Sequence, residues 1–241
     1  MSGLLQSARE NLVFLLTSLA IAAGLILVAV LAEKFLCRGQ KRVSAPRRVA
    51  FVAMFGAVAA VLMLFEIPLF FAPSFYKLDL SEIPVLLCAF YLGPVSGVVC
   101  ELLKVLLKLL LKGTTTAFVG DFANFVVGCS LVLPASVIYH HHRTRKSAIV
   151  GMAVGTASLT VFGSAFNAIY LLPKFAELFG MSLDAIVAMG SAVNASITSV
   201  STLVLLAVAP FNILKGVVVS LVTFLLYKRL EKLFFRRSAA A

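Results

Sequence analysis

The sequence predicts an all-α integral membrane protein, and three observations lead to this fold class. Apolar residues make up 61% of the 241 residues and charged residues only 13%, whereas an average soluble domain carries about 25% charged residues. The apolar residues form long continuous runs, not the apolar–polar alternation of a membrane β-barrel. The length accommodates about six or seven spanning helices of about 20 residues. We therefore expect one compact helical membrane domain without a soluble catalytic module.

The net charge of +11 would suggest a nucleic-acid partner in a soluble protein. Here most of the basic residues lie in three clusters beside apolar segments, at residues 34–48, 140–146 and 228–237. Basic loops of membrane proteins face the cytoplasm. We therefore expect a multi-pass protein of the cell membrane with its N-terminus outside, its C-terminus cytoplasmic and no nucleic-acid partner.

Seven apolar segments are the expected spans. The first, residues 11–32, is long for a signal peptide and has its basic flank after it, so we expect a retained helix. The others are residues 49–65, 83–92, 95–112, 117–139, 148–172 and about 199–226. The three basic clusters follow the first, fifth and seventh of these spans, so all three lie on the same side of the membrane. This agreement supports the count of seven spans.

Small residues in the second expected span form two overlapping pairs, Ala53-x-x-x-Ala57 and Gly56-x-x-x-Ala60. Such pairs allow another helix to approach closely. The spacing alone favours ordinary packing within the molecule over a docking surface for another protein.

Two connections are expected outside the membrane. Residues 66–84 contain three prolines, which exclude a regular helix. The segment is nevertheless rich in aromatic and aliphatic residues, so it is expected to pack onto the molecule, either as a lid over a pocket or as an interfacial aromatic belt. Residues 173–189 are predicted to form an external loop.

Polar residues inside the expected spans are the candidate site residues, because such groups are costly in a membrane and usually face a partner or a cavity. Asn212 and Lys215 lie three residues apart, on one helix face, after Pro210. Glu101, Lys104 and Lys108 form another stripe, which fits an interior ion pair and a polar pocket lining equally well. In the first of these interpretations, Lys108 and Lys112 extend outward.

Two further polar residues stand at the start of a span. Asp121 is explained by the dipole of a helix N-terminus, and Asn124 fits a helix–helix hydrogen bond as well as a site.

Catalytic and metal-binding motifs are not found. The sequence has no G-x-x-x-x-G-K-[ST] phosphate loop, no H-E-x-x-H and no G-x-S-x-G. Three consecutive histidines cannot share one helix face. The cysteines, at positions 37, 88, 100 and 129, form no CxxC pair and are predicted to be small buried residues. We therefore expect a binding protein, without enzymatic activity, cofactor or metal.

Six motifs occur in an order that resembles a known family. They are Phe75-Tyr-Lys-Leu-Asp-Leu-Ser-Glu-Ile-Pro84, Leu92-Gly-Pro-Val-Ser-Gly97, Glu101-Leu-Leu-Lys104, Gly120-Asp-Phe-Ala-Asn124, the stretch around Asn167, and Pro210-Phe-Asn-Ile-Leu-Lys-Gly216. Together they look like the riboflavin-specific substrate-binding subunit, or S component, of energy-coupling factor (ECF) transporters. The similarity covers residues 47–229.

The resemblance implies a six-helix domain that binds riboflavin in an outward-opening pocket. It also implies assembly with a membrane coupling protein and two cytoplasmic ATPases. Family positions that hold the flavin ring match Asn167, Asn212 and Lys215. The other substrate-binding candidates are Phe75, Tyr76, Lys77, Leu78, Asp79, Glu101, Lys104, Gly120, Asp121 and Asn124. In that family, a contact between the S component and the coupling protein maps onto Ala53 and Ala57. The resemblance therefore favours a docking surface over ordinary packing for this pair.

The resemblance leaves three points open. Residues 1–46, comprising the first helix and a basic linker, have no counterpart in the six-helix pattern, so we expect them to be an addition to a domain at 47–241. The resemblance does not decide whether flavin mononucleotide also binds. The alternatives to riboflavin are a different vitamin or, from another functional class, a small membrane enzyme or sensor that uses Glu101 and Lys104.

Overall fold

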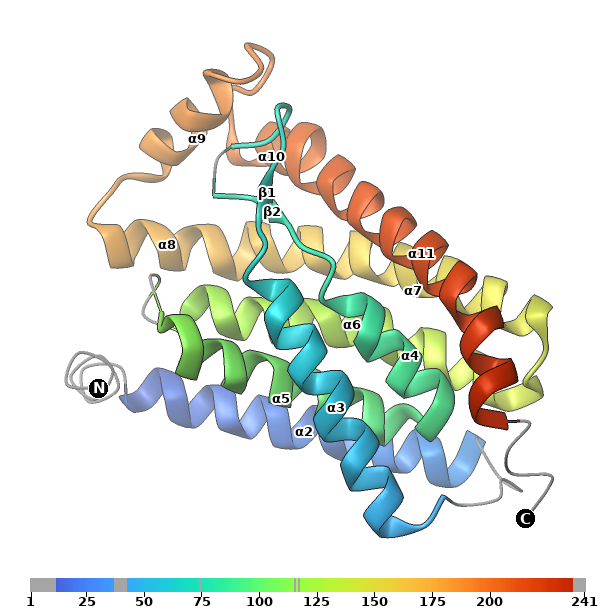
Figure 1. Ribbon diagram of the computed structural model, residues 1–241. Helices are drawn as coiled ribbons and strands as arrows, with labels where there is room; N and C mark the ends of the chain where they lie inside the picture. The colour runs from blue at the N-terminus through green and yellow to red at the C-terminus, as the bar shows by residue number, and fades with distance from the viewer. Residues whose placement is uncertain (1–11, 37–42, 74, 115, 117, 236–241) are drawn as a thin grey trace.

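The computed structural model describes residues 12–36, 43–73, 75–114, 116 and 118–235 as a helical bundle (Figure 1). Of the residues discussed above, residues 1–11, Cys37 and parts of the basic clusters at 34–48 and 228–237 lie outside this range. The helices are α2 (Leu12–Leu36), α3 (Ala45–Met63), α4 (Glu82–Leu92), α5 (Pro94–Lys112), α6 (Val119–His142), α7 (Arg145–Phe166), α8 (Leu172–Phe179), α9 (Leu183–Ser191), α10 (Val200–Leu203) and α11 (Ala209–Phe235). Two π-helical turns, η1 (Asn167–Leu171) and η2 (Val204–Val208), join α7 to α8 and α10 to α11.

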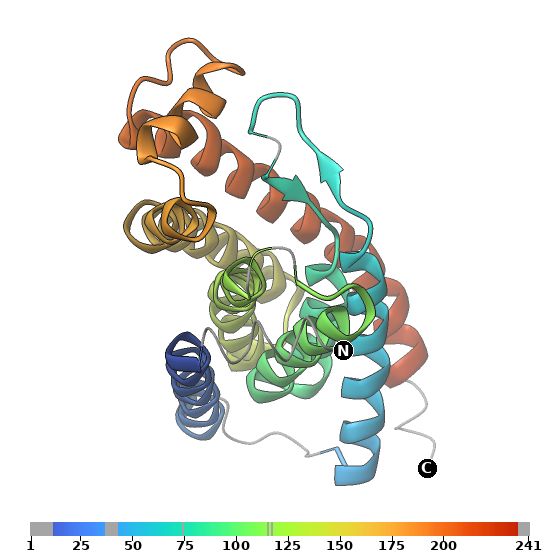
Figure 2. The ribbon, with the colours of Figure 1, turned by 90° about the vertical axis from the view of Figure 1, so that its left-hand side faces the viewer.

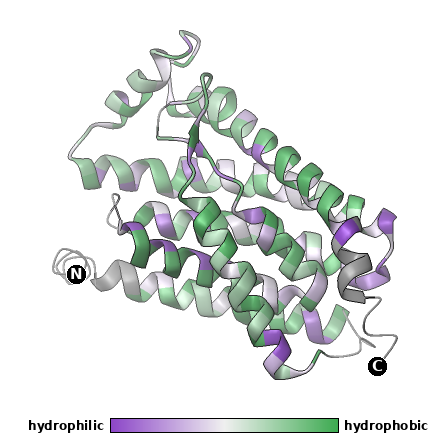
Figure 3. Ribbon diagram, viewed as in Figure 1, coloured by the Kyte–Doolittle hydropathy of each residue, from purple (hydrophilic) through white to green (hydrophobic). Residues whose placement is uncertain are grey.

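Among the described residues, five helical segments are long and apolar enough to cross a membrane. They are α2, α3, α6, the continuous segment from α7 to α8, and the segment from α10 into α11. The two other expected spans are α4, which is short, and α5, which carries four charged residues. Figure 3 shows apolar residues over most of the bundle and hydrophilic residues at its loop ends and on α5. The protein is a multi-pass membrane protein.

The short helix α4 can be short because the rest of the bundle encloses it. It contacts α3, α5, α6 and α11, and nearly all its residues are buried, including Leu86 and Phe90. Phe90 packs against Tyr139 of α6 and Tyr227 of α11 at centroid distances of 4.6 and 6.0 Å. An element that is buried on all sides needs no lipid-facing surface, and α4 is apolar around its whole circumference for the same reason.

Small residues set the closest helix contacts. A Cβ atom at Gly151 of α7 would lie 2.6 Å from the carbonyl oxygen of Ala135 of α6. A Cβ atom at Gly155 would lie at the same distance from the carbonyl oxygen of Leu131. In α3, a Cβ atom at Gly56 would lie 2.7 Å from the Leu103 side chain of α5. The Gly56-x-x-x-Ala60 pair therefore packs within the molecule. Ala53 and Ala57 lie on the exposed side of the same helix.

Replacing Gly128 of α6 by alanine is expected to lower the thermal stability of the purified protein. The new Cβ atom would lie 2.1 Å from Glu101 Oε1, and overpacking of this kind costs about 1–3 kcal/mol. The matched control is Gly24→Ala in α2, where no atom lies within 4 Å of a new Cβ. Equal melting temperatures of the two variants in detergent would show that the α5–α6 contact is looser than described.

The connection between α3 and α4 is a hairpin, as the prolines and apolar side chains predict. Strands β1 (Ile67–Pro68) and β2 (Lys77–Leu78) pair antiparallel. Tyr76 and Leu78 are buried and cluster with Val208 and Phe211 of η2 and α11, and the Tyr76 and Phe211 rings lie 5.6 Å apart. The prediction that this segment packs onto the molecule is confirmed. We call the connection, residues 64–81, the hairpin segment.

The prediction of an external loop at residues 173–189 is wrong, because α8 and most of α9 lie there. Pro173 stands in the first turn of α8, where a backbone donor is not needed. Gly180, at φ +61°, ends that helix, and the Ser182 hydroxyl caps α9 by accepting from Ala185 N at 3.2 Å. These two signals, a glycine and a capping serine close together, were available in the sequence.

The first helix, α2, lies along one side of the bundle against α5 and α6 (Figure 2). Its Ala22 and Ala29 are buried there. Near its C-terminal end, Glu33 accepts a hydrogen bond from Val95 N at 3.2 Å and pairs with Arg48 of α3 at 3.3 Å. The division of the chain at residue 46 stays a prediction.

The predicted burial of the cysteines is confirmed for the described residues, and the three histidines lie on different faces of their helix, as predicted. Cys88, Cys100 and Cys129 are free and buried. His140 is buried, with Nε2 at 2.8 Å from the carbonyl oxygen of Ala89, whereas the next two histidines are exposed. Within the described parts of the chain, no three His, Cys, Asp or Glu side chains are grouped so that they could hold a metal ion.

Candidate functional site

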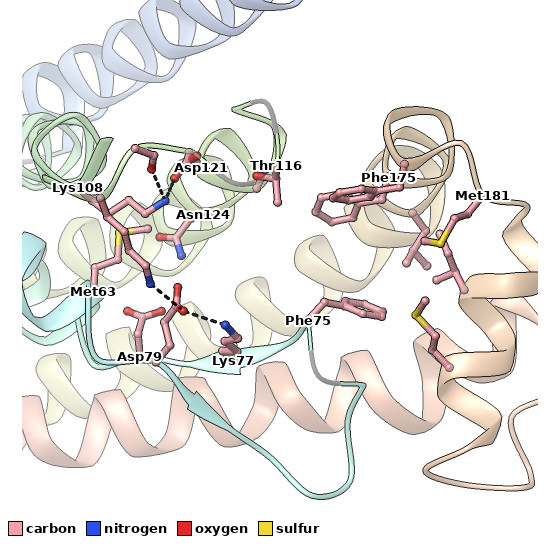
Figure 4. Close-up of a pocket in the computed structure, with 18 residues that line it drawn as sticks. Met63, Phe75, Lys77, Asp79, Lys108, Thr116, Asp121, Asn124, Phe175 and Met181 are labelled. Carbon is pink, nitrogen blue, oxygen red and sulfur yellow. Dashed lines mark hydrogen bonds and ion pairs between the residues drawn. The ribbon is translucent and has the colours of Figure 1, made fainter. Parts of the chain in front are cut away.

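A pocket of about 590 Å³ opens among the hairpin segment, α5, α6, α8 and α9 (Figure 4). Its lining divides into two halves. One half is apolar and comprises Phe75, Leu172, Phe175, Phe179, Met181, Ile186 and Met189. The other half is polar apart from Met63 and comprises Glu66, Lys77, Asp79, Lys108, Lys112, Gly113, Thr116, Gly120, Asp121 and Asn124. A pocket of this size, with an aromatic half and a few convergent polar groups, suits a small organic ligand.

Six of the predicted substrate-binding residues line this pocket. They are Phe75, Lys77, Asp79, Gly120, Asp121 and Asn124. The hairpin segment supplies the first three and the start of α6 the other three. Residues that are far apart in the sequence therefore face one cavity.

The three residues predicted to hold the flavin ring lie behind the hairpin segment, outside the pocket lining. Asn167 accepts a hydrogen bond from the Tyr76 hydroxyl at 2.7 Å and donates to the Gly163 carbonyl oxygen at 2.8 Å. Lys215 is 3.0 Å from both Asp79 and Glu82. The hairpin segment thus covers Asn167 and Lys215 with its own polar side chains.

Asn212 differs from its neighbours because its amide donor is unused. The residue is buried, and its Nδ2 atom has no hydrogen-bond partner among the described residues. A buried donor without an acceptor costs about 1–3 kcal/mol, so such groups call for an explanation. A ligand carbonyl or ring nitrogen placed here would provide the acceptor.

Asp79 joins the pocket to this buried polar layer. Desolvation raises the pKa of its carboxyl group, but the nearby ammonium groups of Lys215 and Lys104 and the hydrogen bonds from Ser81 outweigh burial and hold the pKa below its usual range. Asp79 is therefore ionised at neutral pH and neutralises Lys215. Burial raises the pKa of the Tyr76 hydroxyl, which keeps this group a neutral donor to Asn167.

Comparison with known proteins decides the family. A family model described as "ECF transporter, substrate-specific component" matches residues 47–227. The chain belongs to this family. Helix α2 precedes the matched residues.

Relatives of this S component are named riboflavin transporters. The riboflavin transporter RibU of Staphylococcus aureus is 35% identical over 191 residues, which cover 79% of this chain and 93% of that protein. The riboflavin transporter FmnP of Bacillus subtilis is 28% identical over 187 residues, covering 77% and 92%. These names describe transporters, in agreement with the prediction that this chain is not an enzyme.

A solved structure also resembles the S component. It is described as the structure and mechanism of the S component of a bacterial ECF transporter, and it matches with a TM-score of 0.62 and 36% identity. The match covers 79% of this chain and 98% of that one. The all-helical fold class predicted from the sequence is confirmed.

Glu101 and Lys104 lie in a buried ion network and do not line the pocket of the S component. Lys104 Nζ is 2.5 Å from Glu101 Oε1, 3.3 Å from Glu82 Oε1 and 2.9 Å from Asn124 Oδ1. Both Glu101 and Lys104 are fully buried. The pair ties α4, α5 and α6 together, and it positions Asn124 in the pocket wall. This arrangement offers no access to a reactive pair of the kind the enzyme alternative requires.

Asp121 and Lys108 form an ion pair at 2.5 Å in the pocket wall. Asp121 stands in the first turn of α6, as the dipole interpretation expects, and its Oδ2 atom has no hydrogen-bond partner among the described residues. The expectation that Lys108 extends outward is wrong, because it is buried and also donates to the Gly113 carbonyl oxygen at 3.2 Å. Lys112, by contrast, is exposed as expected.

Several pocket residues were missed in the sequence. The apolar half depends on α8 and α9, where the sequence predicts a loop, so Phe175 and Met181 are not among the predicted site residues. The sequence indicates Glu66 only as the first residue of the connection at 66–84. The charge stripe of α5 was the usable signal for Lys108, since it lies on the same face as Lys104.

Proposed function

We propose that this protein is the riboflavin-binding S component of an ECF transporter. The observation that carries the proposal is its 35% identity to the S. aureus riboflavin transporter across 93% of that protein. The pocket supports it, since it combines aromatic walls with polar groups at a volume suited to one small molecule. The vitamin is the transported substrate and no resident cofactor is required.

The buried polar layer fits the edge of the flavin ring. That edge carries carbonyl and ring-nitrogen acceptors beside an imide N–H donor. Asn212 offers a free amide donor, Lys215 an ammonium donor and Asn167 both a donor and an acceptor. In the structure, Tyr76 is hydrogen-bonded to Asn167 and Asp79 is paired with Lys215. Flavin entry then exchanges those hairpin contacts for contacts to the ring.

The two halves of the pocket suit the rest of the vitamin. The flat ring packs on apolar side chains such as Phe75 and Phe175, with which offset stacking is favourable. The ribityl tail carries four hydroxyl groups, for which Asn124, the Lys108 ammonium and the free Oδ2 atom of Asp121 are suitable partners. Tyr76 and Leu78 face the α11 side of the hairpin segment and support the loop that forms the pocket wall.

Replacing Asn212 by alanine is expected to weaken riboflavin binding by about 2- to 13-fold, which corresponds to one neutral hydrogen bond of about 0.5–1.5 kcal/mol. Folding stability should not fall through a lost hydrogen bond, because Nδ2 donates to no described residue. Riboflavin titration and a melting curve of the same preparation measure both effects. Unchanged affinity would place the ring edge elsewhere.

Identification of the molecule that copurifies with the protein tests the proposal. The S component is purified in detergent, its absorbance in the visible range is recorded, and the released ligand is identified by mass spectrometry. Riboflavin in near-stoichiometric amount supports the proposal. A different vitamin in the pocket would assign the protein to another substrate and leave its family unchanged.

Assembly with a membrane coupling protein and two cytoplasmic ATPases follows from the family. We infer that Ala53 and Ala57 form the docking surface, because they are exposed on α3 and α2 packs mainly on α5 and α6. The end of α2, the start of α3, the α6–α7 turn and the end of α11 lie at one end of the bundle (Figure 1). We propose that this end faces the cytoplasm, because its basic residues agree with the positive-inside rule.

A further inference from the structure

Three charged side chains from different elements meet at the polar end of the pocket. Glu66 Oε2 lies 3.0 Å from Lys77 Nζ of β2 and 3.1 Å from Lys112 Nζ of α5. All three residues line the pocket. Figure 4 draws these two contacts as dashed lines next to the labelled residues Lys77 and Asp79. One carboxylate thus bridges two ammonium groups across the pocket.

The bridge has the composition of an anion site that is already filled. Two ammonium groups about 3 Å from one oxygen are a common arrangement for binding phosphate or carboxylate. Here the anion is the protein's own Glu66. Partial burial works to raise the pKa of Glu66, but hydrogen bonds from Lys77 and Lys112 outweigh it and hold the pKa below its usual value. The carboxylate is therefore charged at neutral pH.

We propose that Glu66 determines ligand specificity by occupying the anion site formed by Lys77 and Lys112, so that the pocket disfavours flavins with an anionic tail. The inference rests on the proposed function, since it concerns the tail of a flavin in this pocket. A neutral ribityl tail does not compete with Glu66. A phosphorylated tail must displace a carboxylate that already lies between the two ammonium groups and offsets one of their two positive charges.

The other charges of the polar half do not relieve this repulsion. Lys108 is paired with Asp121 at 2.5 Å, and Asp79 is paired with Lys215 at 3.0 Å. Within the described residues, Lys77 and Lys112 are thus the ammonium groups of the lining that share Glu66 as their carboxylate partner. Removing the charge of Glu66 makes both of them available to a phosphate group.

The test compares the dissociation constants of flavin mononucleotide and riboflavin, measured by fluorescence quenching at low ionic strength. In Glu66→Gln the affinity for flavin mononucleotide relative to riboflavin should rise about tenfold. Added salt should reduce this gain, because the three side chains are partly exposed. The charge-matched control is Glu177→Gln, which breaks an exposed ion pair with Lys174 and lies outside the lining.

A second variant makes the outcome decisive. Adding Lys77→Gln and Lys112→Gln to Glu66→Gln should abolish the gain. An affinity ratio in Glu66→Gln equal to that of the wild type, with riboflavin still bound, would overturn the inference and leave the proposed function intact. Failure of the wild-type protein to bind either flavin would refute the proposed function itself.

Discussion

Replacing Lys215 by glutamine is expected to weaken riboflavin binding by roughly 10- to 100-fold, since a lost hydrogen bond from a charged donor costs about 1.5–3 kcal/mol. Lys215 is buried on α11, and it is the ammonium group of the polar layer behind the hairpin segment. Fluorescence titration of the purified variant measures the effect. The control is Lys174→Gln, because Lys174 pairs with Glu177 at the surface and does not line the pocket.

The single variant has a second effect that must be separated from the first. Without Lys215, Asp79 loses its ammonium partner and Glu82 keeps only Lys104, and an uncompensated buried charge is strongly destabilising. The double variant Asp79→Asn/Lys215→Gln removes one charge of each sign. If this double variant folds and binds riboflavin as tightly as the wild type, Lys215 does not contact the vitamin.

Replacing Ala53 by tryptophan is expected to prevent assembly with the coupling protein while riboflavin binding persists. A large side chain on the exposed face of α3 separates two closely packed helices, so the yield of copurified coupling protein should fall by more than about tenfold. The pocket is formed by other elements, with Met63 as its single lining residue from α3.

Helix α7 provides a matched control for this substitution. Ala153 and Ala157 have the same spacing as Ala53 and Ala57, and they are also exposed. Ala153→Trp should leave assembly unchanged. If Ala153→Trp blocked assembly and Ala53→Trp did not, the docking surface would lie on α7.

The sequence predicted the helical fold well because apolar runs and basic clusters report directly on membrane spans. It also singled out polar residues that are buried in the structure, since Asn212, Lys215 and Asp121 stand out inside apolar segments. The wrong prediction at residues 173–189 has a local cause. Pro173 and Gly180 are residue types common in loops, yet here both stand at helix ends, Pro173 in the first turn of α8 and Gly180 directly after its last residue.

Pairing between distant residues could not be predicted in this way. Nothing local indicates that Tyr76 donates to Asn167 or that Asp79 neutralises Lys215, which is 136 residues away in the chain. Two lysines of α5, Lys108 and Lys112, also differ in burial although their sequence surroundings are similar. Lys108 is buried against Asp121 of α6, whereas Lys112 is exposed and reaches Glu66 of the hairpin segment.

The most direct test of the account is a titration of the ligand-free S component with riboflavin, followed by quenching of flavin fluorescence. Thiamine and biotin serve as competitors. We expect saturation at one equivalent, no displacement by either competitor, and a weaker curve for Asn212→Ala. Flavin fluorescence that is unaffected by an excess of folded protein would contradict the assignment of this pocket to riboflavin.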